Sequence, residues 1–380
     1  MRIGIEGQRL FRQKKHGMDM VALELVRNLQ EIDQTNEYFI FIKKDEDPCL
    51  ESSENFHIVE LESKPYPLWE QKILPAAARK AGCEILHCTS NTAPIFTSIP
   101  MVVTIHDIIY MESISLFRKG SSSYQRFGNM YRSFIVPMVV KKCRKVITVS
   151  EFEKKRISSF FKIDDSRIKA IYNGVSFHFR PVNDPSVFES LRARYKLPDK
   201  FVFFFGNTDP KKNTIGVLRA LSLFNKRSEE KLHLVMLDFD RQALNKLIDE
   251  VGDSSLNNYI TLTGYIPNSE LPGIYSMSSV FLYPSLRESF GIPMLEAMAC
   301  GTPVITSNTS SMPEVAGNAA IFIDPFKPEQ ITDAMFKLLS DQELRSNLVS
   351  EGYIQSGKFT WKNMAMQMLE VYSEIILNKE

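Results

Sequence analysis

Short apolar stretches alternate along the chain with segments of helical periodicity. In Met18–Ile32, for example, apolar residues recur on one helical face, at Val21, Leu25, Leu29 and Ile32. Between such segments lie apolar or β-branched runs that we predict to be strands: Arg2–Ile5, Tyr38–Ile42, His57–Leu61, Ile85–His87, Met101–Ile105, Val146–Val149, Phe201–Phe205, Leu232–Leu237, Ile260–Leu262, Val280–Tyr283, Pro303–Thr306 and Ala320–Ile323. Apolar strands separated by helices are typical of parallel sheets covered on both faces. The pattern predicts an α/β fold with doubly wound parallel sheets.

The alternation is interrupted once, at the polar segment Phe179–Lys200, which contains three prolines. A chain of 380 residues is longer than one ordinary core supports and suits two domains. We therefore predict an N-terminal domain over residues 1–180 and a C-terminal domain over residues 198–360, with a cleft between them. We expect the final helix, 361–380, to pack back on the N-terminal domain.

Composition narrows the class of protein. The chain is 44% hydrophobic and 24% charged, with a net charge of +1, which argues against a nucleic-acid partner. The N-terminus has no apolar run long enough for a signal peptide, and runs such as Phe201–Phe205 fall far short of the roughly 20 residues that span a bilayer. The five cysteines show no CxxC spacing, so we expect them to be reduced and buried. A cytoplasmic location fits these features.

Unusual residues gather where predicted strands end. Gly17 precedes the first helix, His106 and Asp107 follow Met101–Ile105, Gly206–Asn213 follows Phe201–Phe205, and Glu288–Gly291 follows Val280–Tyr283. Ligands of open α/β sheets bind beyond the carboxyl ends of the strands. The sequence therefore predicts a binding site at this edge.

The segment Glu288–Glu296 combines a helix start with two carboxylates. Pro293 suits the first turn of a helix, and Gly301 suits the position just past its end, so we predict a helix of about two turns. The backbone N–H groups from Ser289, Phe290 and Gly291 onward would form an anion site at its positive end. Two glutamates at this spacing are, by themselves, more often solvated charges than ligands.

Together with the segment Ala297-Met-Ala-Cys-Gly-Thr-Pro-Val304, these glutamates resemble the donor-binding signature of glycosyltransferase family 4. The resemblance continues through Leu262–Ile266 and Ser311–Gly317 and covers nearly the whole second domain. It implies the GT-B fold, in which two Rossmann-like domains face each other across a cleft. It also implies a retaining transfer from a nucleotide sugar held by the C-terminal domain to an acceptor on the N-terminal side.

The resemblance assigns donor contacts residue by residue. Glu288 would bind hydroxyls of the donor sugar, and Glu296 would bind the ribose hydroxyls, roles that a carboxylate can fill as an acceptor of two hydrogen bonds. The backbone of Tyr265 and Ile266 would pair with the edge of the base. An ordinary turn at Gly264 would explain those two residues equally well.

A cation is expected beside the diphosphate. The family motif Pro-Arg-Lys-Asn reads Pro-Lys-Lys-Asn here, which places Lys212 at the lysine position and Lys211 at the arginine position. Many members also carry an arginine where this chain has Asn207, which removes one charge from the phosphate site. The alternative is a solvated lysine pair ahead of a helix capped by Asn213.

The first domain supplies weaker candidates. His106 resembles the histidine of the family that contacts the donor sugar, where it could donate a hydrogen bond and carry partial positive charge. Gly17 could present its N–H to a phosphate or to the acceptor, and His87–Ser90 is a candidate acceptor site. A structural histidine and ordinary packing are the alternatives.

Taken together, the residues and the resemblance predict a hexosyltransferase. His106, Glu288 and Lys212 would be catalytic, with no metal and no cofactor, because the helix dipole and Lys212 can neutralise the diphosphate. The segment Thr306–Gly317 most resembles family members that transfer mannose from GDP-mannose, which implies a role in cell-surface polysaccharide synthesis. The alternatives are a UDP-hexose donor, a nucleotide-sugar epimerase and a non-catalytic sugar-binding protein.

One segment suggests a membrane contact. Residues 124–145 mix aromatic residues and methionines with a basic end, so they could touch anionic lipid or a lipid-linked acceptor on the inner face of the membrane. The alternative is a packed helix whose C-terminal cations are favoured by its dipole.

Overall fold

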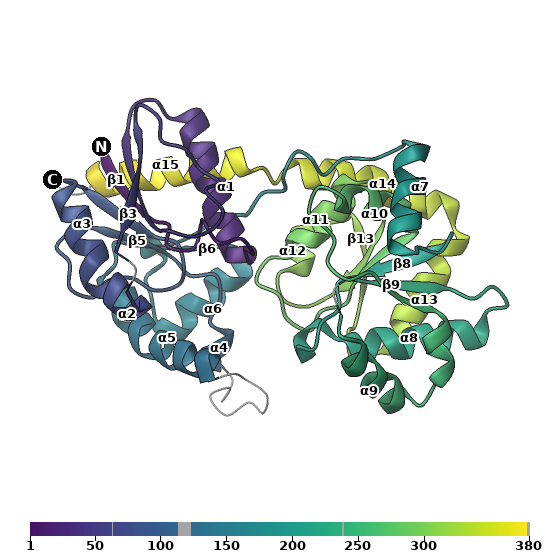
Figure 1. Cartoon of the computed structure of the whole chain (residues 1–380). Coiled ribbons are helices and arrows are strands. Elements are labelled where there is room, and N and C mark those ends of the chain that lie inside the picture. The colour runs from purple at the N-terminus through teal and green to yellow at the C-terminus, as the bar shows by residue number, and fades with distance from the viewer. Residues whose placement is uncertain (63, 113–122, 238, 378–380) are drawn as a thin grey trace. The chain divides into compact units, whose positions relative to one another are not determined.

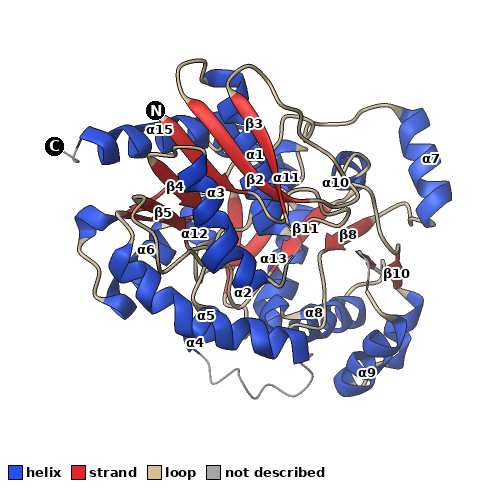
Figure 2. Cartoon of the chain, turned by 60° about the vertical axis from the view of Figure 1, so that its left-hand side comes forward, coloured by secondary structure: helices blue, strands red, loops and turns tan. Residues whose placement is uncertain are grey.

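The computed structural model describes the chain except residues 63, 113–122, 238 and 378–380 (Figure 1). The chain forms two compact units, Met1–Gly174 with Trp361–Glu380 and Val175–Thr360. Each unit is a fully parallel sheet enclosed by helices (Figure 2). The fold class predicted from the sequence, two doubly wound Rossmann-like sheets, is confirmed.

The first unit contains a seven-stranded sheet in the order β3-β2-β1-β4-β5-β6-β7. Its strands are β1 (Arg2–Glu6), β2 (Glu37–Lys43), β3 (Phe56–Leu61), β4 (Ile85–Cys88), β5 (Met101–Thr104), β6 (Lys145–Thr148) and β7 (Ile168–Ala170). Its helices are α1 (Gly17–Ile32), α2 (Tyr66–Leu68), α3 (Leu74–Lys80), α4 (Ile109–Glu112), α5 (Ser123–Lys142), α6 (Glu151–Phe161) and α15 (Trp361–Leu377). The strand β7 was not predicted from the sequence.

Helix α15 belongs to the first unit although it ends the chain, and it packs against α1. A buried contact helps to hold α15 in place. The hydroxyl of Tyr372, on α15, bonds Nδ1 of His87, on β4, at 2.7 Å, and Nε2 of His87 bonds the Thr104 hydroxyl at 2.9 Å. Burial lowers the pKa of His87 to about 3, so the ring is neutral. His87, an acceptor-site candidate from the sequence, thus has both ring nitrogens bonded within the protein.

The second unit contains a six-stranded sheet in the order β10-β9-β8-β11-β12-β13. Its strands are β8 (Phe201–Phe204), β9 (His233–Met236), β10 (Ile260–Leu262), β11 (Val280–Tyr283), β12 (Val304–Ser307) and β13 (Ala320–Ile323). Its helices are α7 (Pro185–Tyr195), α8 (Thr214–Arg227), α9 (Arg241–Val251), α10 (Leu271–Met277), α11 (Ile292–Ala299), α12 (Met312–Ala316), α13 (Pro328–Ser340) and α14 (Gln342–Gly357).

The segment Phe179–Lys200 differs from its interpretation as the connection between domains. It lies within the second unit and contains α7. Asp184 caps this helix by accepting a hydrogen bond from the Ser186 N–H at 2.9 Å, and Pro185 occupies the first turn. Of the three prolines, Pro185 therefore marks the start of a helix.

Both sheets reverse their strand order at one point. In the first unit the reversal lies between β1 and β4, and in the second it lies between β8 and β11. Ligands of doubly wound folds bind outside the carboxyl ends of the strands at such a reversal. The loops after β8 and β11 are therefore the first place to look for a binding site.

Candidate functional site

The loops after β8 and β11 are joined to each other. The Leu286 N–H donates to the Lys211 carbonyl at 2.7 Å, and the Asn213 side-chain amide donates to the carbonyls of Pro284 (3.1 Å) and Pro325 (2.7 Å). The side chain of Asn213 does not cap α8, which was part of the alternative of a solvated lysine pair. Asn213 adopts a left-handed conformation (φ 59°), and its amide links three loops. These bonds fix the backbone that carries Lys212 and Glu288.

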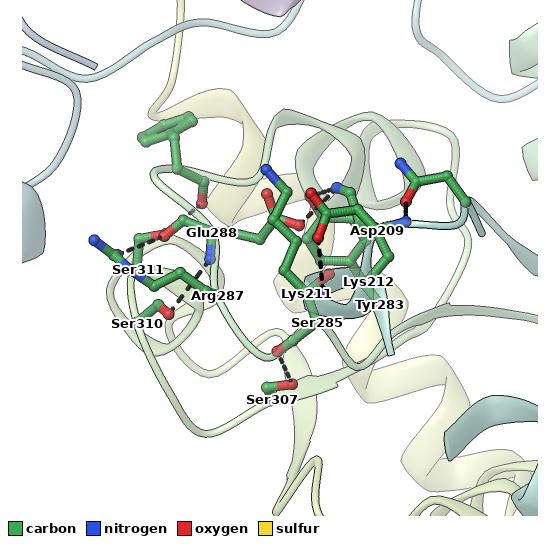
Figure 3. A network of polar contacts seen from close by, with 12 residues as sticks. Asp209, Lys211, Lys212, Tyr283, Ser285, Arg287, Glu288, Ser307, Ser310 and Ser311 are labelled. Carbon is green, nitrogen blue, oxygen red and sulfur yellow. Dashed lines mark hydrogen bonds and ion pairs between the residues drawn. The ribbon is translucent and has the colours of Figure 1, made fainter. Parts of the chain in front are cut away.

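Lys212 and Glu288 meet directly at this edge (Figure 3). The Lys212 Nζ donates to Glu288 Oε1 at 2.6 Å, and only 17% and 12% of the two side chains are exposed. The Lys212 ammonium also lies 5.1 Å from the ring centroid of Tyr283, the buried last residue of β11. Burial, followed by the negative charge of Glu288, raises the pKa of Tyr283 well above its usual range, so its ring stays neutral beneath the ammonium.

The peptide that carries Glu288 is held from the opposite side by two serines (Figure 3). The single proton of the Ser311 hydroxyl is shared between the carbonyls of Glu288 (3.1 Å) and Phe290 (2.9 Å), and the Glu288 N–H donates to Ser310 Oγ at 3.4 Å. Ser310 has φ 56°, a left-handed conformation that is costly for a residue with a Cβ. Ser310 and Ser311 were not singled out from the sequence. They support the Glu288 peptide through bonds to residues 21 to 23 positions earlier in the chain.

Helix α11 begins as predicted. Gly291 precedes it with φ 107°, a conformation open to glycine, and Pro293 lies in its first turn. Gly301 lies just past its end with φ 77°. The Phe290 ring is buried against Phe359, with 5.7 Å between ring centroids, so this residue contributes its backbone to the surface of the site. The eight-residue helix thus directs its first N–H groups toward the loop of Glu288 and Ser289.

Glu296 lies on α11, one turn and more beyond its start. The Tyr275 hydroxyl donates to Glu296 Oε2 at 3.0 Å. Burial raises the pKa of Glu296 to about 7, and the bond from Tyr275 opposes that rise only in part. The carboxyl group is therefore close to half protonated at neutral pH.

The remaining predicted donor contacts lie on two turns of the second unit. In the turn after β8, the exposed Asn207 accepts the Asp209 N–H at 2.8 Å, and Asp209 accepts the Lys211 N–H at 3.0 Å. In the turn after β10, Tyr265 is 67% exposed while Ile266 is buried. The Ile266 side chain packs inside the protein, so only its backbone could serve a ligand.

His106 follows β5 in the first unit and is buried. Its Nε2 lies 3.0 Å from the Thr89 carbonyl, and its backbone N–H donates to Asn91 Oδ1 at 2.7 Å. Because a carbonyl can only accept, Nε2 carries the proton and Nδ1 is left as an acceptor. Burial lowers the pKa of His106, so the ring is neutral. The sequence led us to expect that His106 donates a hydrogen bond and carries partial positive charge. In the structure its Nε2 proton is already bonded within the protein, and Nδ1 can accept a bond from a hydroxyl.

Gly17 begins helix α1 and is exposed, so its N–H lies in the first turn, where helical N–H groups have no partner in the helix. Close by, the His16 N–H donates to Asp19 Oδ2 at 3.0 Å. Asp19 is buried, and its negative charge raises the pKa of His106 against the larger effect of burial. The sequence interpretation did not single out Asp19; the His16-to-Asp19 spacing of a helix start was its only signal.

Among the described residues, no group of three or more His, Cys, Asp or Glu side chains could hold a metal ion. Independence of metals and cofactors stays a prediction. The five cysteines are free, and all but Cys49 are buried.

Two parallel doubly wound sheets, with a lysine–glutamate pair and a helix start at the reversal of the second, are the arrangement that the resemblance to GT-B glycosyltransferases predicts. Residues 16–179 match the sequence model of the family described as Glycosyltransferase Family 4, and residues 188–355 match that of Glycosyl transferases group 1. Between them the two matches take in most of the chain. The chain therefore belongs to glycosyltransferase family 4.

Individual relatives agree with this family. The chain is 30% identical over 228 residues to the O-antigen chain mannosyltransferase B of Escherichia coli, in an alignment covering 60% of each protein. It is 28% identical over 247 residues to the O-antigen chain mannosyltransferase RfbU of Salmonella typhimurium, covering 65% of this chain and 62% of the relative. The chain thus spans less than two thirds of the length of either relative.

A solved structure matches nearly the whole chain. HepE of Anabaena, crystallised with UDP-glucose, superposes with a TM-score of 0.75 over 98% of this chain and 100% of that chain, at 18% sequence identity. At this identity the likeness is one of fold.

Proposed function

We propose that this protein transfers a mannosyl group from GDP-mannose to a glycan or lipid-linked acceptor, with retention of configuration and without a metal ion. The observation that carries the proposal is the Lys212–Glu288 pair, 2.6 Å between Nζ and Oε1, beside the start of α11. A lysine and a helix start stabilise a diphosphate, and an adjacent carboxylate accepts hydrogen bonds from sugar hydroxyls.

The transfer would proceed on one face of the sugar. The bond between the anomeric carbon and the β-phosphate oxygen breaks, and the leaving diphosphate is stabilised by Lys212 and by the N–H groups before and within the first turn of α11. The acceptor oxygen bonds the same face of the anomeric carbon, and its proton passes to the leaving phosphate oxygen. Glu288 orients the sugar as positive charge develops on its ring.

Donor choice rests on the relatives. Two proteins with 28–30% identity to this chain are named mannosyltransferases of O-antigen chains. The relatives support mannose as the sugar and a cell-surface polysaccharide as the product. A UDP-hexose is the second donor class to test, because HepE binds UDP-glucose on the same fold.

Product analysis tests the proposal. Purified protein is incubated with GDP-mannose and a mannose-terminated glycan, with EDTA present, and the anomeric configuration of the product is read by NMR. We expect an α-mannoside, the configuration of the donor. An inverted product would contradict retention, a requirement for metal would contradict the phosphate site, and donor conversion without a glycoside would indicate an epimerase. Binding without conversion would indicate a sugar-binding protein.

A further inference from the structure

Helix α5 presents an unusual face to solvent. Phe127, Met130 and Phe134 are 53%, 55% and 69% exposed, and their spacing places them on one side of the helix. Lys141, two turns further along the same side, is also exposed. We call these four residues the α5 face. Large apolar side chains gathered on one exposed helical side mark a surface that contacts something else.

The opposite side of α5 explains why this face is not part of the core. Ile135, Val136, Val139 and Val140 are buried and pack into the core of the first unit. The helix is thus already anchored by one apolar side. Figures 1 and 2 both show it along the outside of that unit. The second apolar side is available to a partner.

Charge indicates what that partner is. From Ser123 to Ser150 the sequence contains six Lys or Arg residues and no Asp or Glu, although the whole chain has a net charge of only +1. The rest of the chain is therefore net negative, and the positive charge is concentrated here. Lys141 and Arg144 are exposed at the end of α5, and among the described residues neither pairs with a carboxylate.

A third aromatic residue, Phe96, extends the surface at the basic end of the helix. The Lys142 Nζ donates to the Ile95 carbonyl at 2.8 Å and lies 5.3 Å from the centroid of the Phe96 ring. Phe96 is 79% exposed. The lysine thus fixes an exposed aromatic ring beside the cations of α5.

We propose that the α5 face, with Phe96 and Arg144, docks this protein onto an anionic lipid bilayer. Aromatic and methionine side chains would enter the boundary between headgroups and acyl chains, and the cations would lie at the level of the lipid phosphates. No described helix is long and apolar enough to cross a membrane, so the contact would be peripheral. The inference does not depend on the proposed reaction, because bilayer binding can be measured without a donor or an acceptor.

The test is sedimentation of the full chain with lipid vesicles, at two lipid compositions. We expect binding to vesicles with about 30% phosphatidylglycerol, little binding to pure phosphatidylcholine, and release as NaCl rises from about 0.1 to 0.5 M. The variant with Phe134→Ser and Lys141→Glu should bind the anionic vesicles at least about tenfold more weakly. Circular dichroism and a thermal melt confirm that it is folded.

A matched control is available on another helix of the same unit. Lys362 and Met366 lie one turn apart on the exposed side of α15, so Lys362→Glu with Met366→Ser changes the same kinds of residue. This variant should bind vesicles like the wild type. A second variant, Lys141→Glu with Arg144→Glu, changes only exposed charges and should lose binding even if Phe134→Ser perturbs folding.

Three results would overturn the proposal. The first is a wild-type protein that does not bind anionic vesicles. The second is binding that neither α5 variant weakens. The third is self-association of the wild type without lipid, measured by analytical ultracentrifugation, that is lost with Phe134→Ser and Lys141→Glu, because it would identify a second copy of the chain as the partner of this face.

Discussion

The two parallel sheets have the same topology at their reversal points but different chemistry. Beyond β8 and β11, opposite charges meet in the largely buried Lys212–Glu288 pair at the edge of the second sheet. Beyond β1 and β4 in the first unit, the carboxylate of Glu6 is buried and accepts the Thr89 hydroxyl at 3.0 Å and the Gln8 N–H at 3.1 Å. One edge offers charge to a ligand, whereas the other uses its charge inside the protein.

A second carboxylate of the first unit repeats this behaviour. Glu70 is fully buried and accepts hydrogen bonds from the hydroxyls of Tyr66 (2.7 Å), Thr92 and Tyr131 and from the Gln71 amide (2.8 Å). His106 is also buried, and it is neutral. We therefore expect the second unit to contact a diphosphate with charged groups and the first unit to contact hydroxyl groups with neutral ones.

Among these variants, removal of the Glu288 carboxylate should lower kcat the most. We expect Glu288→Ala to lower kcat by about 10³-fold, because its contacts with the sugar should strengthen as charge develops in the transition state. Glu250→Ala is the matched control, since Glu250 pairs with Arg219 on the exposed surface of the same unit. A Glu288→Ala enzyme within threefold of the wild type would remove Glu288 from the reaction.

A His106 variant tests the role of this neutral side chain in the first unit. We expect His106→Ala to lower kcat by about 10²-fold through loss of an oriented acceptor at Nδ1, while His57→Ala, at a half-buried histidine of the same unit that pairs with Glu37, has no effect. Because burial lowers the pKa of His106, the rate of the wild type should show no titration of this ring above pH 6.5. A rate that rises as a histidine becomes protonated would show that His106 acts as a cation.

Variants of the neighbouring residues Lys211 and Lys212 test whether phosphate binding needs one positioned lysine or only positive charge nearby. Lys212 is largely buried in its pair with Glu288, whereas Lys211 is tied to the site by its backbone. Lys212→Ala should weaken GDP binding by roughly 30-fold, the loss of one charge-assisted hydrogen bond, and Lys211→Ala by less than about threefold. Equal losses in titration calorimetry would indicate that only net charge matters.

The pH dependence of nucleotide binding should be the smallest effect. Burial raises the pKa of Glu296 from 4.5 to about 7, so the native state holds its proton more tightly than the unfolded chain does. This group therefore stabilises the fold fully below pH 4.5, and that stabilisation is lost as pH rises to 7. The predicted ribose contacts are strongest with the ionised form, which accepts two hydroxyl bonds, so we expect GDP affinity to fall severalfold from pH 8 to pH 6.

The variant Glu296→Gln should remove that pH dependence, because the amide does not titrate. The decisive comparison is the ratio of the GDP dissociation constants at pH 6 and pH 8 in the variant and in the wild type. An unchanged ratio would exclude Glu296 as the titrating group.

The sequence predicted what depends on local patterns. Most strands, the start of α11 at Gly291 and the gathering of Lys212 and Glu288 at one edge follow from hydrophobic periodicity, helix signals and the rule for parallel strand ends. Helix α7 was missed although Asp184 and Pro185 are a recognisable helix start, because the prolines were interpreted as a connection.

Features that depend on distant contacts could not be predicted. The tautomer of His106 is set by the Thr89 carbonyl, and the conformation of Asn213 by carbonyls 71 and 112 residues away. The support that Ser310 and Ser311 give to the Glu288 peptide likewise exists only once β11 and β12 are paired. Such contacts decide how a predicted residue can act.

The central claim is that the charged edge of the second unit binds a nucleotide diphosphate without a metal. Titration calorimetry of GDP-mannose, with UDP-glucose and ADP-glucose for comparison, tests it when each titration is run with and without EDTA. We predict that GDP-mannose binds most tightly, with the same affinity in both buffers, and that Lys212→Ala weakens this binding. Binding that EDTA abolishes, or that Lys212→Ala leaves unchanged, would contradict the claim.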